Sequence, residues 1–583
     1  DAPDDALGKL DNYLCELKEL QIRDGLHIFG ESPTGPQLTD LLVALTRLPR
    51  NAGESGDASI VRALAADLGF EDFDPLDCTM GAPWDGPRPA PLAALTGSAW
   101  RTCGDTVERL ELLAAGLVAG TQSPACAWDA TRAVLAYIDT ELGETVRQCG
   151  PAELDALVTA LSGLFVEPGA SGAPTRGRPD VLPTGRNFYS VDSRVVPTPA
   201  AWQLGWRSAG LLLDRYRQDH GEWPTELALS AWGTSNMRTG GDDIAQALAL
   251  LGVKPTWETS SRRVTGFEVI PLDLLDRPRI DVTLRVSGFF RDAFPAQIDL
   301  FDSAVRAVAT ADEPPDRNPL AKRYQEDRAW LIANGADDGT ASRRAGFRVF
   351  GSKPGAYGAG LQALIDERGW RDTSDLARAY LTWSGYAYGN GSAGDAEHQL
   401  FERRISRIQA VVHNQDNREH DLLDSDDYYQ FEGGMAAAVE HLSGELPTIY
   451  HNDHSRPESP KIRALDEEIA RVVRARVVNP KWIDGVMRHG YKGAFEMAAT
   501  VDYLFAFAAT TRAVRDHHFD AVFAAYLEDA RVRDFVSEHN RAALTEMSGR
   551  LLEALERGLW QPRSNSARAL LRSLSEASAE EPR

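Results

Sequence analysis

The alternation of strand and helix signals over residues 186–355 constrains the fold more than any other feature of the sequence. The apolar run 227–232 ends at a glycine and is followed by a helical pattern over 242–251. The β-branched run 279–286 ends at Ser-Gly, and a second helical pattern follows over 294–309. Strand, glycine turn and helix in repetition are typical of a layer built on a parallel sheet. Ligands of such a layer bind at the carboxyl ends of the strands.

The regions on either side of this layer read as helical, which predicts a multi-domain α/β and α protein. We expect a mainly helical region at 1–175 with a ligand-facing loop near 24–33, and an α/β domain with strand-end loops at 176–358. A helix-rich C-terminal domain with His-rich loops is expected at 359–583. A chain of 583 residues has room for about three or four domains of ordinary size.

The charge and cysteine content exclude several classes of protein. The net charge of −24 argues against nucleic acid as a partner and against docking on an anionic membrane. The sequence contains no run of about 18 apolar residues, so it predicts no transmembrane helix. The five cysteines include no CxxC pair, which argues against a disulfide framework or a cysteine-based zinc site. We therefore expect a cytoplasmic protein.

The start of the chain lacks both an initiator methionine and the features of a signal peptide. This pattern predicts the cut edge of a longer protein. The chain also lacks a GxxxxGK[ST] motif, and the Gly-rich run 351–360 has the wrong spacing and a central proline. We interpret that run as a tight turn, with an anion-binding nest as the alternative, and we expect no ATPase activity in this chain.

Histidines are concentrated late in the chain, where ten of the twelve lie between 398 and 539. The segment 450–455 offers His451 and His454 beside a carboxylate, and His413 opens a polar segment that follows an apolar run. Imidazole with carboxylate suits Co, Ni, Zn or Fe. The polar residues predict loops, in which a solvated histidine is the alternative to a metal ligand.

Two further groups of residues are candidates for a site. His27 and Glu31 stand four apart, but two glycines favour a strand-to-loop element over a helix; a packed His and a surface Glu are the alternative. Arginines fork carboxylates through two hydrogen bonds, and three of them at strand ends suggest a site for a polycarboxylate, although each alone fits a surface ion pair. These arginines and the polar residues of the same segments form the candidate substrate-binding set: Arg186, Asn187, Arg238, Thr239, Arg291, Asp292, Asn414 and Asp416.

Several long motifs occur in one order along the chain, at residues 185–192, 232–241, 266–269, 276–282, 287–292 and 478–482. Together they resemble one family. The chain is similar, from about residue 20 to 562, to the C-terminal half of the large tetrapyrrole-binding subunit of class I chelatases. That family contains the cobaltochelatase CobN and the H subunit of magnesium chelatase.

The cobalt branch of the family fits better than the magnesium branch. The magnesium branch resembles the chain at 25–27 with Glu31, at 232–234 and at 479–482, but it typically lacks the His-rich segment 451–454. The segments that resemble the cobalt branch are 186–192, 414–421, 426–431, 451–456 and 487–498.

The resemblance implies insertion of Co²⁺ into hydrogenobyrinic acid a,c-diamide, in aerobic cobalamin biosynthesis. Cobalt is then the substrate metal, and ATP-Mg is used by an AAA+ ATPase subunit and its partner chelatase subunit, of the CobS and CobT type. Glu31 matches a Glu that is implicated in catalysis in the magnesium enzymes, so the resemblance implies a catalytic role for Glu31. His27 is a second candidate base. We expect an open cobalt site with ligands drawn from Glu31, His413, His451 and His454.

Three other functions stay open at this point. The chain is alternatively an H subunit of magnesium chelatase acting on protoporphyrin IX, for which harder oxygen ligands are expected. It is alternatively a tetrapyrrole-binding scaffold fragment without catalytic capacity. A metallohydrolase built on His451 and His454 is a weak third alternative, because no HExxH helix accompanies them.

Overall fold

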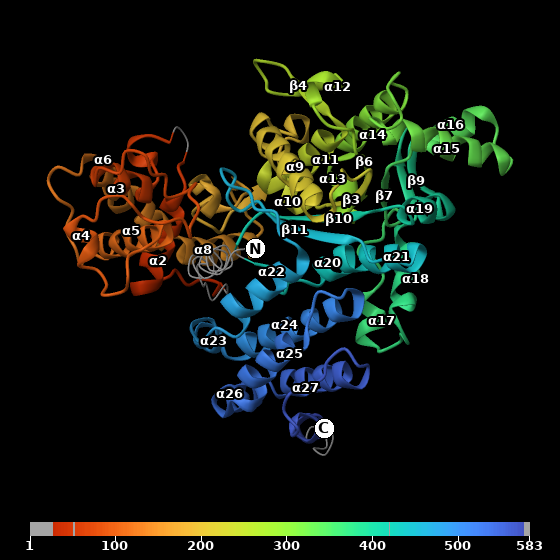
Figure 1. Cartoon of the computed structure of the whole chain (residues 1–583). Helices are drawn as coiled ribbons and strands as arrows, with labels where there is room; N and C mark the ends of the chain where they lie inside the picture. The colour runs from red at the N-terminus through yellow and green to blue at the C-terminus, as the bar shows by residue number, and fades with distance from the viewer. Residues whose placement is uncertain (1–26, 51–52, 190, 419, 577–583) are drawn as a thin grey trace. The chain divides into compact units, whose positions relative to one another are not determined.

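A computed structural model describes residues 27–50, 53–189, 191–418 and 420–576 of the chain (Figure 1). The chain divides into two compact units, residues 1–191 and residues 192–583. Each unit is described by itself.

The first unit is a set of helices around one apolar core. Helix α5 begins with a capping box, in which Thr102 Oγ1 accepts from the Asp105 amide and Asp105 Oδ2 accepts from the Thr102 amide. Two short strands, β1 (Pro168–Ala170) and β2 (Asn187–Tyr189), pair in parallel near the end of the unit. The helices are α2 (Gly35–Arg47), α3 (Ile60–Asp67), α4 (Ala90–Ala93), α5 (Cys103–Val118), α6 (Asp129–Tyr137), α7 (Gly143–Arg147) and α8 (Cys149–Leu161).

The second unit contains a seven-stranded sheet in the order β11-β10-β3-β6-β7-β8-β9. The pairs from β11 to β7 are parallel, whereas β7–β8 and β8–β9 are antiparallel. The sheet is therefore mixed. Its strands from the expected layer at 176–358, β3, β6 and β7, pair in parallel as predicted, whereas the antiparallel strands β8 and β9 come from the later region and are joined by a tight turn. The strands are β3 (Glu226–Ala231), β6 (Asp281–Val286), β7 (Val349–Gly351), β8 (Tyr386–Gly389), β9 (Ser392–Ala396), β10 (Ala410–Gln415) and β11 (Thr448–Asp453).

Four of these strands, β8 to β11, come from the region beyond residue 359, which the sequence predicted as helix-rich. The expectation that His451 lies in a loop is wrong, because β11 runs through it. The polar second halves of β10 and β11 hide the strand pattern, since both strands end in polar residues at the edge where ligands of parallel sheets bind.

Helices cover both faces of the sheet, as Figure 1 shows, with α9, α11 and α14 on one side and α18 and α21 on the other. A separate hairpin, β4 (Val253–Trp257) with β5 (Val264–Val269), follows α11. The helices that precede residue 410 are α9 (Pro199–His220), α10 (Gly233–Thr239), α11 (Asp242–Leu251), α12 (Leu272–Leu275), α13 (Gly288–Ala293), α14 (Pro295–Ala309), α15 (Pro319–Ala333), α16 (Asp338–Ala345), α17 (Gln362–Asp366), α18 (Thr373–Ser384) and α19 (His398–Ile405).

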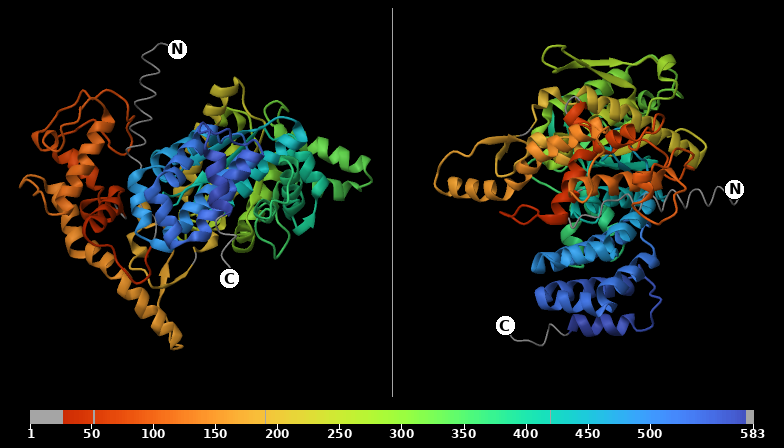
Figure 2. Two further views of the ribbon diagram at one scale, coloured as in Figure 1. Left: turned by 90° about the horizontal axis from the view of Figure 1, so that it is seen from below. Right: turned by 90° about the vertical axis from the view of Figure 1, so that its left-hand side faces the viewer.

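The chain beyond β11 is helical and ends in a bundle that both views of Figure 2 show in blue. Among the helices of the described ranges, none is long and apolar enough to cross a membrane. The helices after β10 are α20 (Asp426–Tyr428), the π-helical turn η6 (Tyr429–Gly433), α21 (Gly434–Ser443), α22 (Leu465–Val472), α23 (Pro480–Met487), α24 (Gly490–Thr510), α25 (Asp516–Phe523), α26 (Ala530–His539), α27 (Arg541–Glu556) and α28 (Ala567–Glu576).

Candidate functional site

The register of β10 and β11 places like residues side by side at the carboxyl ends of the strands. His413 pairs with His451, and Asn414 pairs with Asn452. Because successive side chains of a strand point to opposite faces, the two histidines share one face of the sheet and the two asparagines share the other.

The two histidines form a buried pair. Their rings are parallel within 9° with centroids 5.0 Å apart, and each residue is only 1% exposed. The Tyr428 ring lies 5.0 Å from the His413 ring, and Trp232 Nε1 lies 3.5 Å from His413 Nδ1. His451 Nδ1 lies 3.0 Å from an oxygen of Glu432, which is itself fully buried in η6.

Burial and nearby charges shift the pKa values of the two histidines in opposite directions. Burial holds the pKa of His413 well below its usual value, and the neighbouring His451 and His420 act in the same direction. Burial alone would also lower the pKa of His451, but the Glu432 carboxylate outweighs burial and raises it. His413 is therefore a neutral imidazole at pH 7, which is the form that binds metal ions.

The asparagine face carries a hydrogen-bond network to α11. Asn414 Nδ2 donates to Asp243 Oδ1 at 3.0 Å and to Gln246 Oε1 at 2.8 Å, and Asn452 Nδ2 donates to Asn414 Oδ1 at 3.0 Å. Asp243 also accepts the backbone N–H of Trp232 at 3.2 Å. Burial raises the pKa of Asp243 to about 7. The network fixes the ends of β3 and β10 against each other.

His454 does not join the histidine pair. Its Nε2 lies 2.7 Å from Ser208 Oγ on α9, and Ser208 Oγ also accepts from Gln246 Nε2 at 2.9 Å. His454 therefore belongs with the α9–α11 side of the sheet. In the part of the chain that the structure describes, no group of three or more His, Cys, Asp or Glu side chains is arranged to hold a metal ion.

The strand-end arginines already have partners within the protein. Arg238 forks Asp416 with two bonds of 2.8 Å, and Asp416 is only 5% exposed. Arg291 bonds Asp292 at 2.7 Å and also donates to three backbone carbonyls of the loop 352–356. Thr239 Oγ1 accepts the amide of Asp242 at 3.0 Å, at the start of α11. A substrate carboxylate must therefore compete with protein acceptors for either guanidinium.

The remaining predicted residues lie in the first unit. His27 Nε2 lies 2.9 Å from Glu153, which is 5% exposed and also accepts from the Gly30 amide at 2.8 Å and from Thr184 Oγ1 at 2.5 Å. Glu153 thus ties the loop that carries His27 and Glu31 to α8. Glu31 is exposed.

Arg186 and Asn187 are also exposed and lie at the start of β2. His27 and Glu31 fall in one unit, whereas His413 and His451 fall in the other. A cobalt site that joins the two pairs stays a prediction.

Sequence reasoning missed several residues of this arrangement. Glu432 had a signal that could have found it: a lone acidic residue in the run 431–439, which is otherwise apolar or glycine. Glu153 had none, because it lies in a helical pattern where an acidic residue normally faces solvent. Tyr428, Trp232 and Asp243 lie in or beside quoted motifs, but only the folded structure brings them to the histidine pair and the asparagine network.

Comparison with known proteins gives a consistent result. The family described as CobN/Magnesium Chelatase matches residues 1–567. The aerobic cobaltochelatase subunit CobN of a Sinorhizobium species is 64% identical over 97% of this chain and 46% of its own length. CobN of Pseudomonas aeruginosa is 58% identical over 96% of this chain and 45% of its own length. Magnesium-chelatase subunit ChlH of rice is 30% identical over 95% of this chain and 41% of its own length.

A solved structure gives the same match. The catalytic subunit of cobaltochelatase from Mycobacterium tuberculosis superposes with a TM-score of 0.88 at 43% identity, over 99% of this chain and 47% of that one. The chain spans about half the length of the curated relatives that it matches.

Proposed function

The chain belongs to the CobN/magnesium chelatase family, and from that premise we propose that it is part of a cobaltochelatase subunit that inserts Co²⁺ into a tetrapyrrole. The likeness to the mycobacterial catalytic subunit over almost the whole chain carries this proposal. The specific tetrapyrrole that we propose as substrate is hydrogenobyrinic acid a,c-diamide, in the aerobic route to cobalamin. ATP-Mg is hydrolysed by an AAA+ subunit and its partner, of the CobS and CobT type, in the cytoplasm.

The reaction requires ligands for cobalt and an acceptor for the two ring N–H protons. His413 and His451 are the proposed contacts for Co²⁺, since borderline cations favour imidazole. Glu31 and His27 are the proposed proton acceptors. The proposed contacts to the macrocycle's peripheral carboxylates and amides are Arg186, Asn187, Arg238, Thr239, Arg291, Asp292, Asn414 and Asp416.

The histidine pair favours cobalt over magnesium. Mg²⁺ prefers oxygen ligands and retains several waters, whereas the carboxyl ends of β10 and β11 present two stacked imidazoles. An H subunit that acts on protoporphyrin IX is therefore the second candidate, and a non-catalytic scaffold is the third.

The test is single-turnover insertion of Co²⁺, with the chain as the cell makes it and with its partner ATPase subunits. We expect His413→Ala and His451→Ala to lower the insertion rate at least about tenfold, a loss of about 1.4 kcal/mol in transition-state stabilisation. The matched control is His441→Ala, because His441 is an exposed histidine of α21. Wild-type rates in both pair variants contradict the proposed cobalt contact. Insertion of Mg²⁺ in preference to Co²⁺ contradicts the proposed function. ATP hydrolysis by the purified chain alone contradicts the proposal that separate subunits hydrolyse the ATP.

A further inference from the structure

Glu432 is a carboxylate in an unusual place. It lies in the π-helical turn η6, is fully buried, and is followed by Gly433, Gly434 and Met435. A buried carboxylate is costly unless it is paired or hydrogen-bonded. Within the described residues its one ion pair is with His451, and no lysine or arginine approaches it. Burial raises the pKa of Glu432, and the His451 ring acts against burial by favouring the ionised carboxylate.

The contact fixes the chemistry of the His451 ring. Nδ1 lies 3.0 Å from Glu432 Oε2, and an ionised Glu432 can only accept, so with the carboxylate ionised the Nδ1 proton is donated to it. The other ring nitrogen, Nε2, is buried and has no hydrogen-bond partner among the residues that the structure describes. With Nδ1 carrying the proton, the lone pair of the neutral ring resides on Nε2.

A carboxylate behind one nitrogen and an open lone pair on the other is how proteins orient histidines that ligate metals. The strand backbone of β11 fixes the position of the ring, and the parallel His413 ring at 5.0 Å restricts its rotation. Glu432 is the remaining constraint, since it selects which nitrogen is free. π-helical turns such as η6 are frequent at functional sites.

We propose that Glu432 is a positioning residue, which holds the His451 imidazole with its proton on Nδ1 so that Nε2 is presented to Co²⁺. The inference rests on the proposed function and names the group that prepares its cobalt contact. As the cobalt–nitrogen bond forms, one water leaves the hydrated ion. If Nε2 is protonated beforehand, that proton passes to solvent.

The experiment is a titration of the full chain with Co²⁺ alone, followed by visible absorption, for wild type, Glu432→Gln, Glu432→Asp and His451→Gln. Loss of a carboxylate behind a ligating histidine typically weakens metal binding 10- to 100-fold. We expect a loss of that size in Glu432→Gln, because the amide can also donate to Nδ1 and so favours the wrong tautomer. Glu432→Asp keeps the carboxylate and should recover part of the affinity, and His451→Gln should lose at least as much as Glu432→Gln.

The matched control is Glu397→Gln. Glu397 is 6% exposed and forks Arg344 with two bonds of 2.7 Å, so its change also removes a buried carboxylate. This variant should lose stability but keep the wild-type affinity and spectrum for Co²⁺. A loss of cobalt affinity in Glu397→Gln equal to that in Glu432→Gln would reduce the effect to general destabilisation and overturn the inference.

The remaining outcomes separate the inference from the proposed function. Wild-type affinity in Glu432→Gln, no gain of Glu432→Asp over Glu432→Gln, or no cobalt binding by the wild-type chain each overturns the inference. Cobalt binding that depends on Glu432, in a chain that fails to insert cobalt with its partner subunits, supports the positioning role and contradicts the proposed function. Normal cobalt insertion together with normal cobalt binding in Glu432→Gln supports the proposed function and contradicts the positioning role.

Discussion

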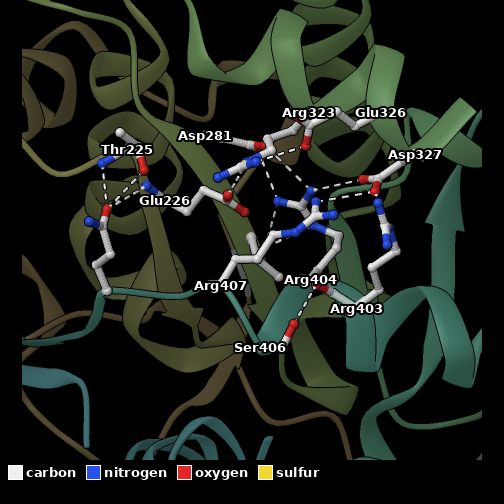
Figure 3. A network of polar contacts seen from close by, with 12 residues as sticks. Thr225, Glu226, Asp281, Arg323, Glu326, Asp327, Arg403, Arg404, Ser406 and Arg407 are labelled. Atoms are coloured by element: carbon white, nitrogen blue, oxygen red, sulfur yellow. Dashed lines mark hydrogen bonds and ion pairs between the residues drawn. The ribbon is translucent and has the colours of Figure 1, made fainter. Parts of the chain in front are cut away.

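The two ends of the sheet in the second unit differ in how their buried carboxylates are paired. At the amino ends of the strands, every buried carboxylate meets arginines in the network of Figure 3. At the carboxyl ends, the buried aspartates Asp416 and Asp453 also pair with arginines, but Asp243 and Glu432 contact no arginine among the described residues. Charges paired with opposite charges hold a structure together, whereas polar groups that lack such a partner can act on a ligand.

The amino-end network joins four elements. Glu226 and Asp281 are the first residues of β3 and β6, Asp327 lies on α15, and Arg404 lies on α19. Asp281 accepts from Arg348 at 2.6 Å and from Arg404 at 3.0 Å, and all three side chains are fully buried. The partners of the other two carboxylates are Arg323 for Glu226, and Arg403 and Arg407 for Asp327.

One aspartate from each end shows the consequence. Burial alone would raise the pKa of Asp281, but Arg348 and Arg404 outweigh it and lower the pKa below its usual value. Asp243 has no such cation, and burial raises its pKa to about 7. Two buried aspartates, one in β6 and one in α11 beside the sheet, therefore differ in charge at pH 6, because only one of them faces arginines.

The largest expected effect is at the amino end. Asp281→Ala leaves Arg348 and Arg404 buried without their shared carboxylate, and breaking a buried pair in this way costs about 3–5 kcal/mol. Urea unfolding of the full chain measures the change in the free energy of unfolding. A loss below about 1 kcal/mol would remove the distinction between the two ends.

The second effect depends on pH and belongs to the carboxyl end. The raised pKa of Asp243 means that the folded chain holds a proton between about pH 4 and pH 7 that the unfolded chain has released, so stability falls as pH rises through this range. Asp243→Asn removes this dependence. Relative to wild type, its free energy of unfolding should therefore rise from pH 5 to pH 8 by up to about 3 kcal/mol.

The control for that measurement is Asp281→Asn at the same two pH values. The lowered pKa of Asp281 means that its contribution is lost only as pH falls below about 4, so the difference from wild type should be the same at pH 5 and pH 8. A pH-independent difference in Asp243→Asn would show that its carboxyl is ionised throughout.

The third effect concerns an arginine that does lie near the carboxyl end. Arg238→Ala removes two charge-assisted hydrogen bonds from Asp416, which is 5% exposed, and should cost about 1–3 kcal/mol of stability. Arg238→Lys should recover only part of the loss, because an ammonium cannot fork a carboxylate. Thermal unfolding of both variants tests this, and full recovery by lysine would count against the forked geometry.

The smallest effect serves as a baseline for the other three. Arg343 and Asp395 form a pair at 3.2 Å whose side chains are 38% and 48% exposed. Asp395→Ala should change the free energy of unfolding by less than about 1 kcal/mol, since solvent screens exposed pairs. A larger change in the same urea series would mean that burial does not account for the difference between these ion pairs.

The sequence was sufficient for elements whose pattern is local. The helical pattern at 242–251 coincides with α11, and the β-branched run 279–286 contains β6. It was insufficient for β10 and β11, because three polar residues at the end of each strand resemble a loop. Strand pairing supplies the missing information, and it acts between segments far apart in the chain.

The candidate site divides in the same way. The density of histidines pointed to His413 and His451, which the structure brings together. It also pointed to His454, which bonds Ser208 instead. Residue type alone does not tell which face of the sheet a side chain occupies, and Asn414 reaches Asp243 across 171 residues of sequence.

The order of strands in the sheet has a consequence for the synthesis of the chain. β3 is an interior strand whose neighbour β10 is made late: Thr225 and Gln409, which meet beside it, are 184 residues apart. A ribosome that adds about 5–20 residues per second takes roughly 10–40 s to cover that interval. Throughout it, one side of β3 is an unpaired strand edge, which is a template for pairing with other nascent chains. The speed of translation and the shielding of that edge by chaperones thus bear on how much of the newly made protein reaches the correct sheet.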